Sequence, residues 1–176
     1  MKTLILINRL SALLCLTAVL ALIYFMAFLG LQPCPLCLVQ QFSLGIITFF
    51  VLFRMVLASP YRPLFCWLSN SLIIVFSLFG AIMAMRQIWM QTHPDQYAGQ
   101  CLLDVTTMIH TLPFSELLKT FFYGTPDCAT THWSLFGISM PVYSGLLFIA
   151  FLALHLYNMY FRLRNHHDLN NKDVSL

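Results

Sequence analysis

Cys34 and Cys37 have the spacing of a redox-active pair. They form a C-x-x-C motif, Cys34-Pro35-Leu36-Cys37, directly before a long apolar stretch that predicts a helix. The N-terminal end of a helix carries partial positive charge and free N–H groups, and both would stabilise a thiolate on Cys37. Because the thiolate is the form that attacks a disulfide, this placement indicates thiol–disulfide exchange.

Cys101 and Cys128 stand further along the chain, in a stretch without a strong fold pattern of its own. A disulfide between them would be either structural, worth about 3 kcal/mol as a loop closure, or a second exchangeable pair. A structural zinc site is the main alternative for the four cysteines, but Cys101 and Cys128 lack the second C-x-x-C spacing. A c-type haem is excluded because Leu38, and not His, follows Cys37. No metal is expected.

The composition is that of a membrane protein. Only 9% of the 176 residues are charged and 60% are apolar, whereas an ordinary soluble domain has about 25% charged and about 45–50% apolar residues. A soluble fold of this size needs a charged surface that this chain lacks. The net charge of +3 is spread thinly, so nucleic-acid binding is not expected.

The distribution of charges and prolines predicts four spans in a single domain, residues 1–176. No charged residue occurs between Arg9 and Arg54. One helix over that stretch would be about 66 Å long, far more than the hydrocarbon core of about 30 Å. Pro33 and Pro35 break the stretch into two helices. We therefore expect an all-α membrane protein, a four transmembrane helix bundle with spans near 10–30, 38–57, 64–85 and 141–161.

The first apolar stretch follows Met1-Lys2, as the apolar part of a signal peptide would. It continues far beyond the roughly 7–15 residues of such a segment and has no convincing small-x-small cleavage site. We therefore interpret it as the first span.

Basic residues predict the orientation. Four spans place both termini on one side of the membrane, together with the loop 58–63. Arg86 and Lys119 fall on the other side, whereas the first side collects most of the basic residues: Lys2, Arg9, Arg54, Arg62, Arg162, Arg164 and Lys172. The positive-inside rule then places both termini in the cytoplasm. A short loop (31–37) and a long loop (86–140) face outward.

This topology separates the cysteines into two classes. The two groups described above fall on the outer side, where disulfides form and persist. Cys15 and Cys66 fall within or at the end of spans, and we interpret them as small buried apolar residues.

The long outer loop contains a predicted amphipathic helix. Its apolar residues recur at helical spacing with polar residues between them: Phe114, Leu117, Leu118, Phe121 and Phe122. Such a helix would lie on the outer membrane surface or pack against the bundle, and the pattern fits both arrangements equally.

The chain resembles the DsbB family, the disulfide bond formation proteins of bacterial inner membranes, over nearly its whole length. The length, the four spans and the two outer cysteine groups all match. The specific motifs are Cys34-Pro35-Leu36-Cys37, Arg86-Gln87-Ile88-Trp89-Met90-Gln91 with Pro94 and Cys101, Gly124-Thr125-Pro126-Asp127-Cys128, and Trp133-Ser134-Leu135-Phe136-Gly137-Ile138-Ser139-Met140-Pro141.

The resemblance implies a quinone-dependent protein-disulfide oxidoreductase of the inner membrane, with its active cysteines on the periplasmic side. By resemblance, a Cys101–Cys128 disulfide accepts electrons from a periplasmic thioredoxin-fold oxidase of the DsbA type, and Cys101 forms the mixed disulfide. The Cys34–Cys37 disulfide then reoxidises the loop pair through a transient Cys34–Cys128 bond. Cys37 delivers the electrons to a membrane quinone, ubiquinone or menaquinone.

One position departs from the family pattern. The family usually has an arginine four residues after the second C-x-x-C cysteine and associates it with the quinone, whereas this chain has Gln41. A neutral amide donates hydrogen bonds but supplies no positive charge. We predict that Gln41 contacts the quinone and that Arg86, at the outer end of the third span, supplies the missing charge. An interfacial anchor is the alternative for Arg86.

Two other functions stay open at this point. One is a DsbI-like relative that serves a dedicated partner, and Gln41 keeps it open. The other is a non-catalytic membrane protein whose outer loops are held by two structural disulfides. Resistance to reduction would distinguish them, because structural disulfides resist the glutathione pool whereas catalytic ones exchange.

Overall fold

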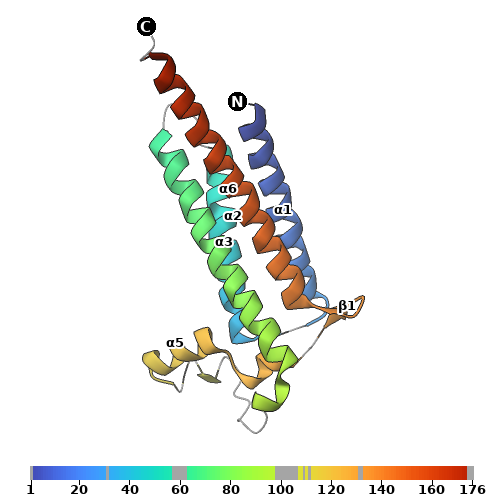
Figure 1. The fold of residues 1–176 in the computed structure, drawn as a ribbon. Coiled ribbons are helices and arrows are strands. Elements are labelled where there is room, and N and C mark those ends of the chain that lie inside the picture. The colour runs from blue at the N-terminus through green and yellow to red at the C-terminus, as the bar shows by residue number, and fades with distance from the viewer. Residues whose placement is uncertain are drawn as a thin grey trace.

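Four long helices form the body of the protein (Figure 1). The computed structural model describes residues 2–30, 32–56, 63–97, 107–108, 110, 112–130 and 133–173. The long helices are α1 (Lys2–Ala27), α2 (Pro35–Val56), α3 (Pro63–Thr92) and α6 (Met140–Asp173). Short elements lie between α3 and α6: η1 (Pro94–Tyr97), α5 (Phe114–Tyr123), η2 (Pro126–Ala129), β1 (Ser134–Leu135) and β2 (Ile138–Ser139).

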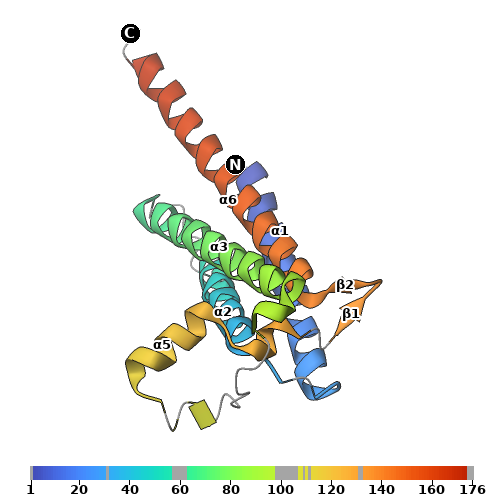
Figure 2. The ribbon, with the colours of Figure 1, turned by 60° about the horizontal axis from the view of Figure 1, so that its bottom comes forward.

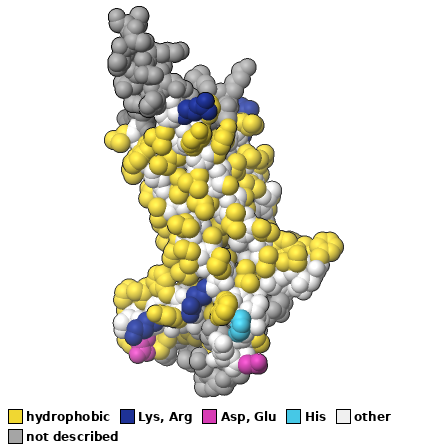
Figure 3. Space-filling model, in the orientation of Figure 1, with side chains coloured by type: hydrophobic (Ala, Val, Ile, Leu, Met, Phe, Trp, Pro, Cys, Tyr) yellow, Lys and Arg dark blue, Asp and Glu magenta, His cyan; other side chains and the backbone are white. Residues whose placement is uncertain are grey.

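Each long helix is long and apolar enough to cross a membrane. The candidate spans are Ile5–Ala27, Pro35–Val56, Leu64–Thr92 and Met140–Arg164. The shortest has 22 residues and a length of about 33 Å. Hydrophobic side chains cover the middle of the bundle on the face shown, and charged ones gather toward its two ends (Figure 3). The predicted four-span, all-α membrane fold is confirmed.

Helix α3 continues beyond the predicted span end at residue 85. Neither Gly nor Pro occurs between Gly80 and Pro94, so the helix runs on to Thr92. Arg86 therefore lies on the last turns of a helix and not at the start of a loop. The start of α1 and the end of α6 lie at the same end of the bundle, opposite η1 and α5 (Figure 1).

Helix α3 lies at the centre of the packing, between α2 and α6. It approaches α6 closely at Gly80, where a Cβ atom would lie 2.5 Å from the Phe148 ring. The apolar core is continuous across α2, α3 and α6, and Cys15 joins it from α1: its buried members also include Leu44, Ile47, Val51, Ile73 and Phe151. The prediction that Cys15 is a small buried residue is confirmed, since its side chain is almost fully covered.

A buried polar network lies in the half of the bundle away from the C-x-x-C motif. The His155 ring contacts Ser11 Oγ at 3.2 Å and Asn70 Oδ1 at 2.8 Å. Asn70 Nδ2 also donates to the His155 carbonyl oxygen at 3.0 Å. These bonds join α1, α3 and α6, and the apolar core lies between them and the C-x-x-C motif.

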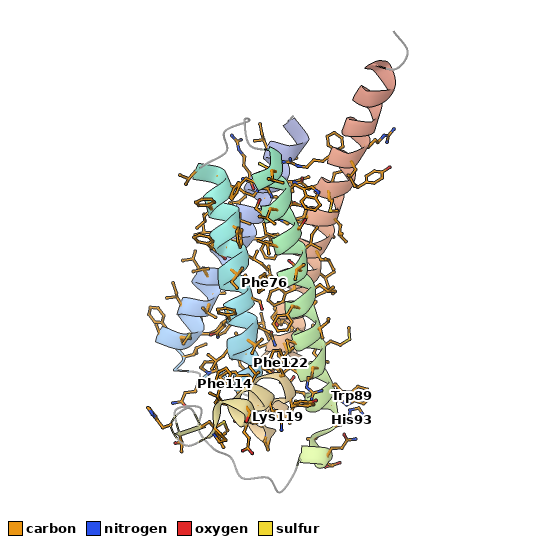
Figure 4. The ribbon with its side chains drawn as sticks, turned by 90° about the vertical axis from the view of Figure 1, so that its left-hand side faces the viewer. Phe76, Trp89, His93, Phe114, Lys119 and Phe122 are labelled. Carbon is orange, nitrogen blue, oxygen red and sulfur yellow. The ribbon has the colours of Figure 1, made fainter. Side chains whose placement is uncertain are left out.

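Two small elements flank the end of the bundle at which α2 begins, on opposite sides, α5 and the β1–β2 hairpin (Figure 2). Helix α5 packs across α2, and its Phe122 ring meets the Phe79 ring edge to face at 6.0 Å. Phe122 lies on the side of α5 toward the spans, and Lys119 lies on the side away from them (Figure 4). The predicted amphipathic helix exists, and it packs against the bundle while it leaves Phe114 exposed.

Candidate redox site

The C-x-x-C motif forms the first turn of α2. Pro35 is the first helical residue, a position where its missing N–H costs no helical hydrogen bond. The Leu38 N–H donates to the Cys34 carbonyl oxygen at 3.0 Å, so Cys34 stands directly before the helix. The Cys34 and Cys37 sulfurs lie 3.1 Å apart. That is a contact between thiols, since a disulfide bond is about 2.05 Å long.

Cys128 reaches this motif from the long segment between α3 and α6. The turn η2 carries it, and its N–H donates to the Thr125 carbonyl oxygen at 2.9 Å. Its side chain is 1% exposed. The Cys128 sulfur accepts hydrogen bonds from the Cys34 thiol and from the Leu36 backbone N–H. The structure therefore brings together three of the four predicted catalytic cysteines. The fourth, Cys101, lies outside the described residues.

Gly124 allows this close approach. Its φ of +81° is a conformation that side chains with a Cβ atom rarely adopt. A Cβ atom there would also lie 2.8 Å from Leu36 Cδ1 and 2.9 Å from Met90 Sδ. A glycine at this position therefore lets the segment before Cys128 descend onto the ends of α2 and α3.

Hydrogen bonds between the sulfurs shift the pKa values of Cys34 and Cys128 in opposite directions. The Cys34 thiol donates to Cys128 and to Cys37, and these bonds, together with burial, raise the pKa of Cys34. The same Cys34 donor lowers the pKa of Cys128 to about 6, with help from backbone N–H groups and against the effect of burial. At neutral pH the fold therefore favours a Cys128 thiolate beside a protonated Cys34. A thiolate next to the sulfur of a C-x-x-C pair is the arrangement that thiol–disulfide exchange requires.

A chain of side-chain hydrogen bonds leads from α6 to the C-x-x-C sulfurs. Ser144 Oγ donates to Gln40 Oε1 at 2.6 Å, and Gln40 Nε2 donates to Gln87 Oε1 at 2.8 Å. These contacts orient the Gln87 amide so that its Nε2 donates to Cys37 Sγ at 3.2 Å and to Cys34 Sγ at 3.5 Å. Sequence reasoning missed this chain. The available signal was the presence of uncharged polar residues near the ends of three spans.

A cavity of about 390 Å³ opens beside the same sulfurs. Its walls are mostly apolar and come largely from α1 and α6: Ala18, Ala21, Leu22, Phe25, Met26, Leu147 and Phe148. Gln41 and Gln91 line it together with Cys34 and Cys37. The Gln91 Oε1 atom is buried and has no hydrogen-bond partner. The cavity therefore offers apolar walls with amide groups near a reactive sulfur, the usual character of a small-molecule site.

Arg86 lies apart from this cavity. Its Nε and Nη2 atoms donate to the Tyr123 carbonyl oxygen at 3.0 and 2.9 Å, and its guanidinium stands over the Tyr123 ring at 5.1 Å. The cation therefore caps the C-terminal end of α5, where a helix carries partial negative charge. Arg86 is not among the residues that line the cavity. Its predicted contact with a quinone stays a prediction.

The four spans and the cysteine cluster define the class of the protein, a membrane-embedded thiol–disulfide oxidoreductase. A family model described as Disulfide bond formation protein DsbB matches residues 5–158. The chain belongs to the DsbB family. The resemblance inferred from the sequence motifs is confirmed.

Individual relatives carry the same name. The chain is 33% identical over 134 residues to Disulfide bond formation protein B 1 of Pseudomonas aeruginosa, a match that covers 76% of this chain and 81% of that protein. It is 31% identical over 142 residues to Disulfide bond formation protein B of Psychrobacter arcticus, with 77% of each chain covered. It is also 31% identical over 154 residues to Disulfide bond formation protein B of Hahella chejuensis, a match that covers 84% of this chain and 90% of that protein.

Proposed function

We propose that this protein reoxidises a periplasmic thioredoxin-fold oxidase of the DsbA type and passes the electrons to a membrane quinone, ubiquinone or menaquinone. The observation that carries the proposal is the position of Cys34. Its sulfur hydrogen-bonds to both Cys37 and Cys128, and the cluster borders an apolar cavity. An exchange site between a soluble dithiol and a membrane-resident acceptor needs both features.

Electrons enter at the long outer segment. A thiolate of the reduced partner attacks Cys101 of a Cys101–Cys128 disulfide. A mixed disulfide forms on Cys101 as the old bond breaks, and Cys128 leaves as a thiolate with the electron pair. The Leu36 N–H donates to the Cys128 sulfur and supports it in this charged form, whereas Cys34 has no proton to donate while it is held in the Cys34–Cys37 disulfide. The release of Cys128 is therefore favoured by the environment that receives it.

The second step moves the charge to Cys37. The Cys128 thiolate attacks the Cys34 sulfur of a Cys34–Cys37 disulfide. The Cys34–Cys128 bond forms as the Cys34–Cys37 bond breaks, and Cys37 leaves as a thiolate, so electrons and charge balance. The first turn of α2 and the Gln87 Nε2 donor at 3.2 Å stabilise this leaving group.

The cavity residues fit a quinone. Apolar walls suit a ring and an isoprenoid tail, and the Gln41 amide offers donors to a ring oxygen. The unpartnered Gln91 Oε1 offers an acceptor to a hydroxyl group of the quinol product. When bound, a quinone takes up two electrons and two protons and leaves as a quinol. The protein holds the Cys37 sulfur at the cavity wall and keeps the surroundings apolar, so the site is matched to an acceptor that dissolves in the membrane.

The proposed location is the bacterial inner membrane, with the cysteine cluster on the periplasmic side. The positive-inside rule supports this orientation, because the end of the bundle opposite the cysteines carries most of the basic residues. The periplasm is also the compartment in which disulfides persist. Lipid surrounds the spans, and the soluble partner approaches from the periplasm.

Quinone reduction by the purified protein in detergent tests the proposal. A reduced DsbA-type oxidase serves as the electron donor, and ubiquinone and menaquinone are supplied in turn. We expect turnover that the Cys37→Ser variant abolishes. The Cys66→Ser variant is the matched control, because Cys66 lies on α3 in the other half of the bundle. A folded protein that turns over neither quinone would contradict the proposal and favour a dedicated partner.

A further inference from the structure

The β1–β2 hairpin ends in an unusual turn. Ser134 pairs with Ser139 and Leu135 pairs with Ile138, so only two residues, Phe136 and Gly137, connect the strands. Both have positive φ, +52° for Phe136 and +76° for Gly137. Such a turn normally has Asn, Asp or Gly at its first position, because a bulky side chain is strained there. A phenylalanine at the tip therefore points to a function that local backbone preference does not explain.

The hairpin tip, residues 135–138, is apolar and exposed. Phe136 is 91% exposed, and Leu135 and Ile138 are also exposed in part. A tip of this kind in water would present a large apolar surface with no benefit to folding. Its neighbours in the sequence supply no charged side chain. The sequence contains no Asp, Glu, Lys or Arg between Asp127 and Arg162.

The hairpin tip lies close to the start of a membrane span. The span of α6 begins at Met140, directly after β2, so the base of the hairpin stands at the membrane boundary. The hairpin projects sideways from the bundle, away from α5, in both ribbon views (Figures 1 and 2). Figure 3 shows hydrophobic side chains along this projection and on the neighbouring flank of the bundle. The tip surface therefore continues the lipid-facing surface of the spans.

Two contacts hold the hairpin at this height. The Tyr143 hydroxyl of α6 donates to the Leu135 carbonyl oxygen at 3.0 Å. The Trp133 ring meets the Phe25 ring of α1 edge to face at 4.6 Å. Tyrosine and tryptophan are the residues that favour the membrane–water interface. The hairpin is thus braced against both α1 and α6 and directed along the plane of the membrane.

We propose that the hairpin tip, residues 135–138, is a membrane anchor that inserts Phe136 into the outer leaflet beside α1 and α6. The occupant of this surface is lipid, because the tip is continuous with the lipid-facing belt and offers no charge to a protein partner. The anchored segment also carries Trp133 and, a few residues earlier, Cys128. The anchor would therefore hold the Cys128 turn at the level of the C-x-x-C motif. This proposal does not depend on the identity of the electron acceptor.

Photocrosslinking in liposomes tests this proposal. p-Benzoylphenylalanine replaces Phe136 in the full-length protein, and the control places it at Asp95, an exposed residue of η1. After irradiation, mass spectrometry detects phospholipid adducts on each variant. We expect abundant lipid adducts at position 136 and at least tenfold fewer at position 95.

A second label at Ile138 guards against a local change at the turn, and it is expected to give lipid adducts as well. Two results would overturn the anchor. One is an absence of lipid adducts at both 136 and 138 in protein that retains its Cys34–Cys128 contact. The other is a dominant adduct to a second copy of the chain, which would assign the tip to self-association.

Discussion

The Cys34 thiol donates a hydrogen bond to the Cys128 sulfur, although one residue directly precedes α2 and the other follows α5. The same thiol lies 3.1 Å from the Cys37 sulfur. Cys34 is therefore the sulfur that both neighbours can reach. This relationship explains how electrons would pass from the long outer segment to the membrane edge, because one exchange at Cys34 joins the two cysteine groups.

The Gln87 amide is expected to support Cys37 as a leaving group. Gln87→Met keeps the length of the side chain but removes the donor at 3.2 Å and leaves the Gln40 amide without its acceptor. A hydrogen bond to a charged group is worth about 1.5–3 kcal/mol, so partner-driven quinone reduction should fall about tenfold or more. Stopped-flow absorbance of the quinone measures the rate.

Gln96→Met in η1 is the matched control, since it removes an exposed amide that makes no side-chain contact with the sulfurs. An unchanged rate in Gln87→Met would show that the oriented amide chain has no part in the exchange.

The Cys128 thiolate is expected to form at unusually low pH. Its folded-state pKa is about 6, below the roughly 8.5 of an ordinary thiol. Ionisation of Cys128 therefore stabilises the folded state. The full stabilisation is present when the pH is above the ordinary thiol pKa, and it is lost as the pH falls through about 6. The ultraviolet thiolate absorbance of the fully reduced protein, minus that of Cys128→Ser, gives the titration curve.

The Cys34→Ala variant removes the hydrogen-bond donor that is the largest cause of this shift. The midpoint of the Cys128 titration should move upward in that variant. A midpoint that stays in place would assign the low pKa to the backbone N–H groups instead.

Gly124 is expected to control the distance between the two cysteine groups. In Gly124→Ala the new Cβ atom would contact Leu36 and Met90 at under 3 Å in a backbone conformation unfavourable for alanine. Overpacking of this kind costs about 1–3 kcal/mol, so exchange between Cys128 and Cys34 should slow about tenfold. Quenched-flow alkylation followed by mass spectrometry measures that exchange.

Gly45→Ala is the comparison, because a Cβ atom at Gly45 meets nothing within 4 Å and the residue lies inside α2. Equal exchange rates in the two alanine variants would contradict the role assigned to Gly124.

Arg86 gives a prediction with two readouts. Arg86→Gln removes both hydrogen bonds to the Tyr123 carbonyl oxygen, and limited proteolysis should cut α5 several-fold faster. Arg86→Lys should restore protection only in part, since lysine lacks the planar fork of donors. The apparent affinity for quinone tests the sequence-based prediction separately. An unchanged affinity in Arg86→Gln would remove Arg86 from the quinone site.

The sequence predicted the spans and the C-x-x-C pair because both depend on local patterns. A long apolar run without charges favours the membrane over water, independently of the rest of the fold. Two cysteines one helical turn apart lie close together on the same helix. The approach of Cys128 to Cys34 came only from family resemblance. It depends on the conformation of Gly124 and on how η2 meets α2, and neither is encoded by spacing.

The amide chain and the hairpin were not predicted, for a related reason. Gln40, Gln87 and Ser144 stand on three different helices, and their contacts depend on helix rotation, which hydropathy does not determine. The hairpin has strands of two residues each, too short for a period-two pattern to be visible. The predicted third span ends at residue 85 because Arg86 is the first charged residue after it, whereas the helix itself continues to Thr92.

The most direct test of the relay is the rate of disulfide formation when only one cysteine of the C-x-x-C motif is left to pair with Cys128. In the Cys37→Ser/Cys101→Ser variant, oxidation should link Cys34 to Cys128 nearly completely, as peptide mass spectrometry would show. In the Cys34→Ser/Cys101→Ser variant, Cys37 should link to Cys128 much more slowly, because Cys34 is the sulfur that lies between the other two. Equal linkage of Cys128 to either cysteine, or linkage to Cys37 alone, would contradict the exchange at Cys34 on which the proposed relay depends.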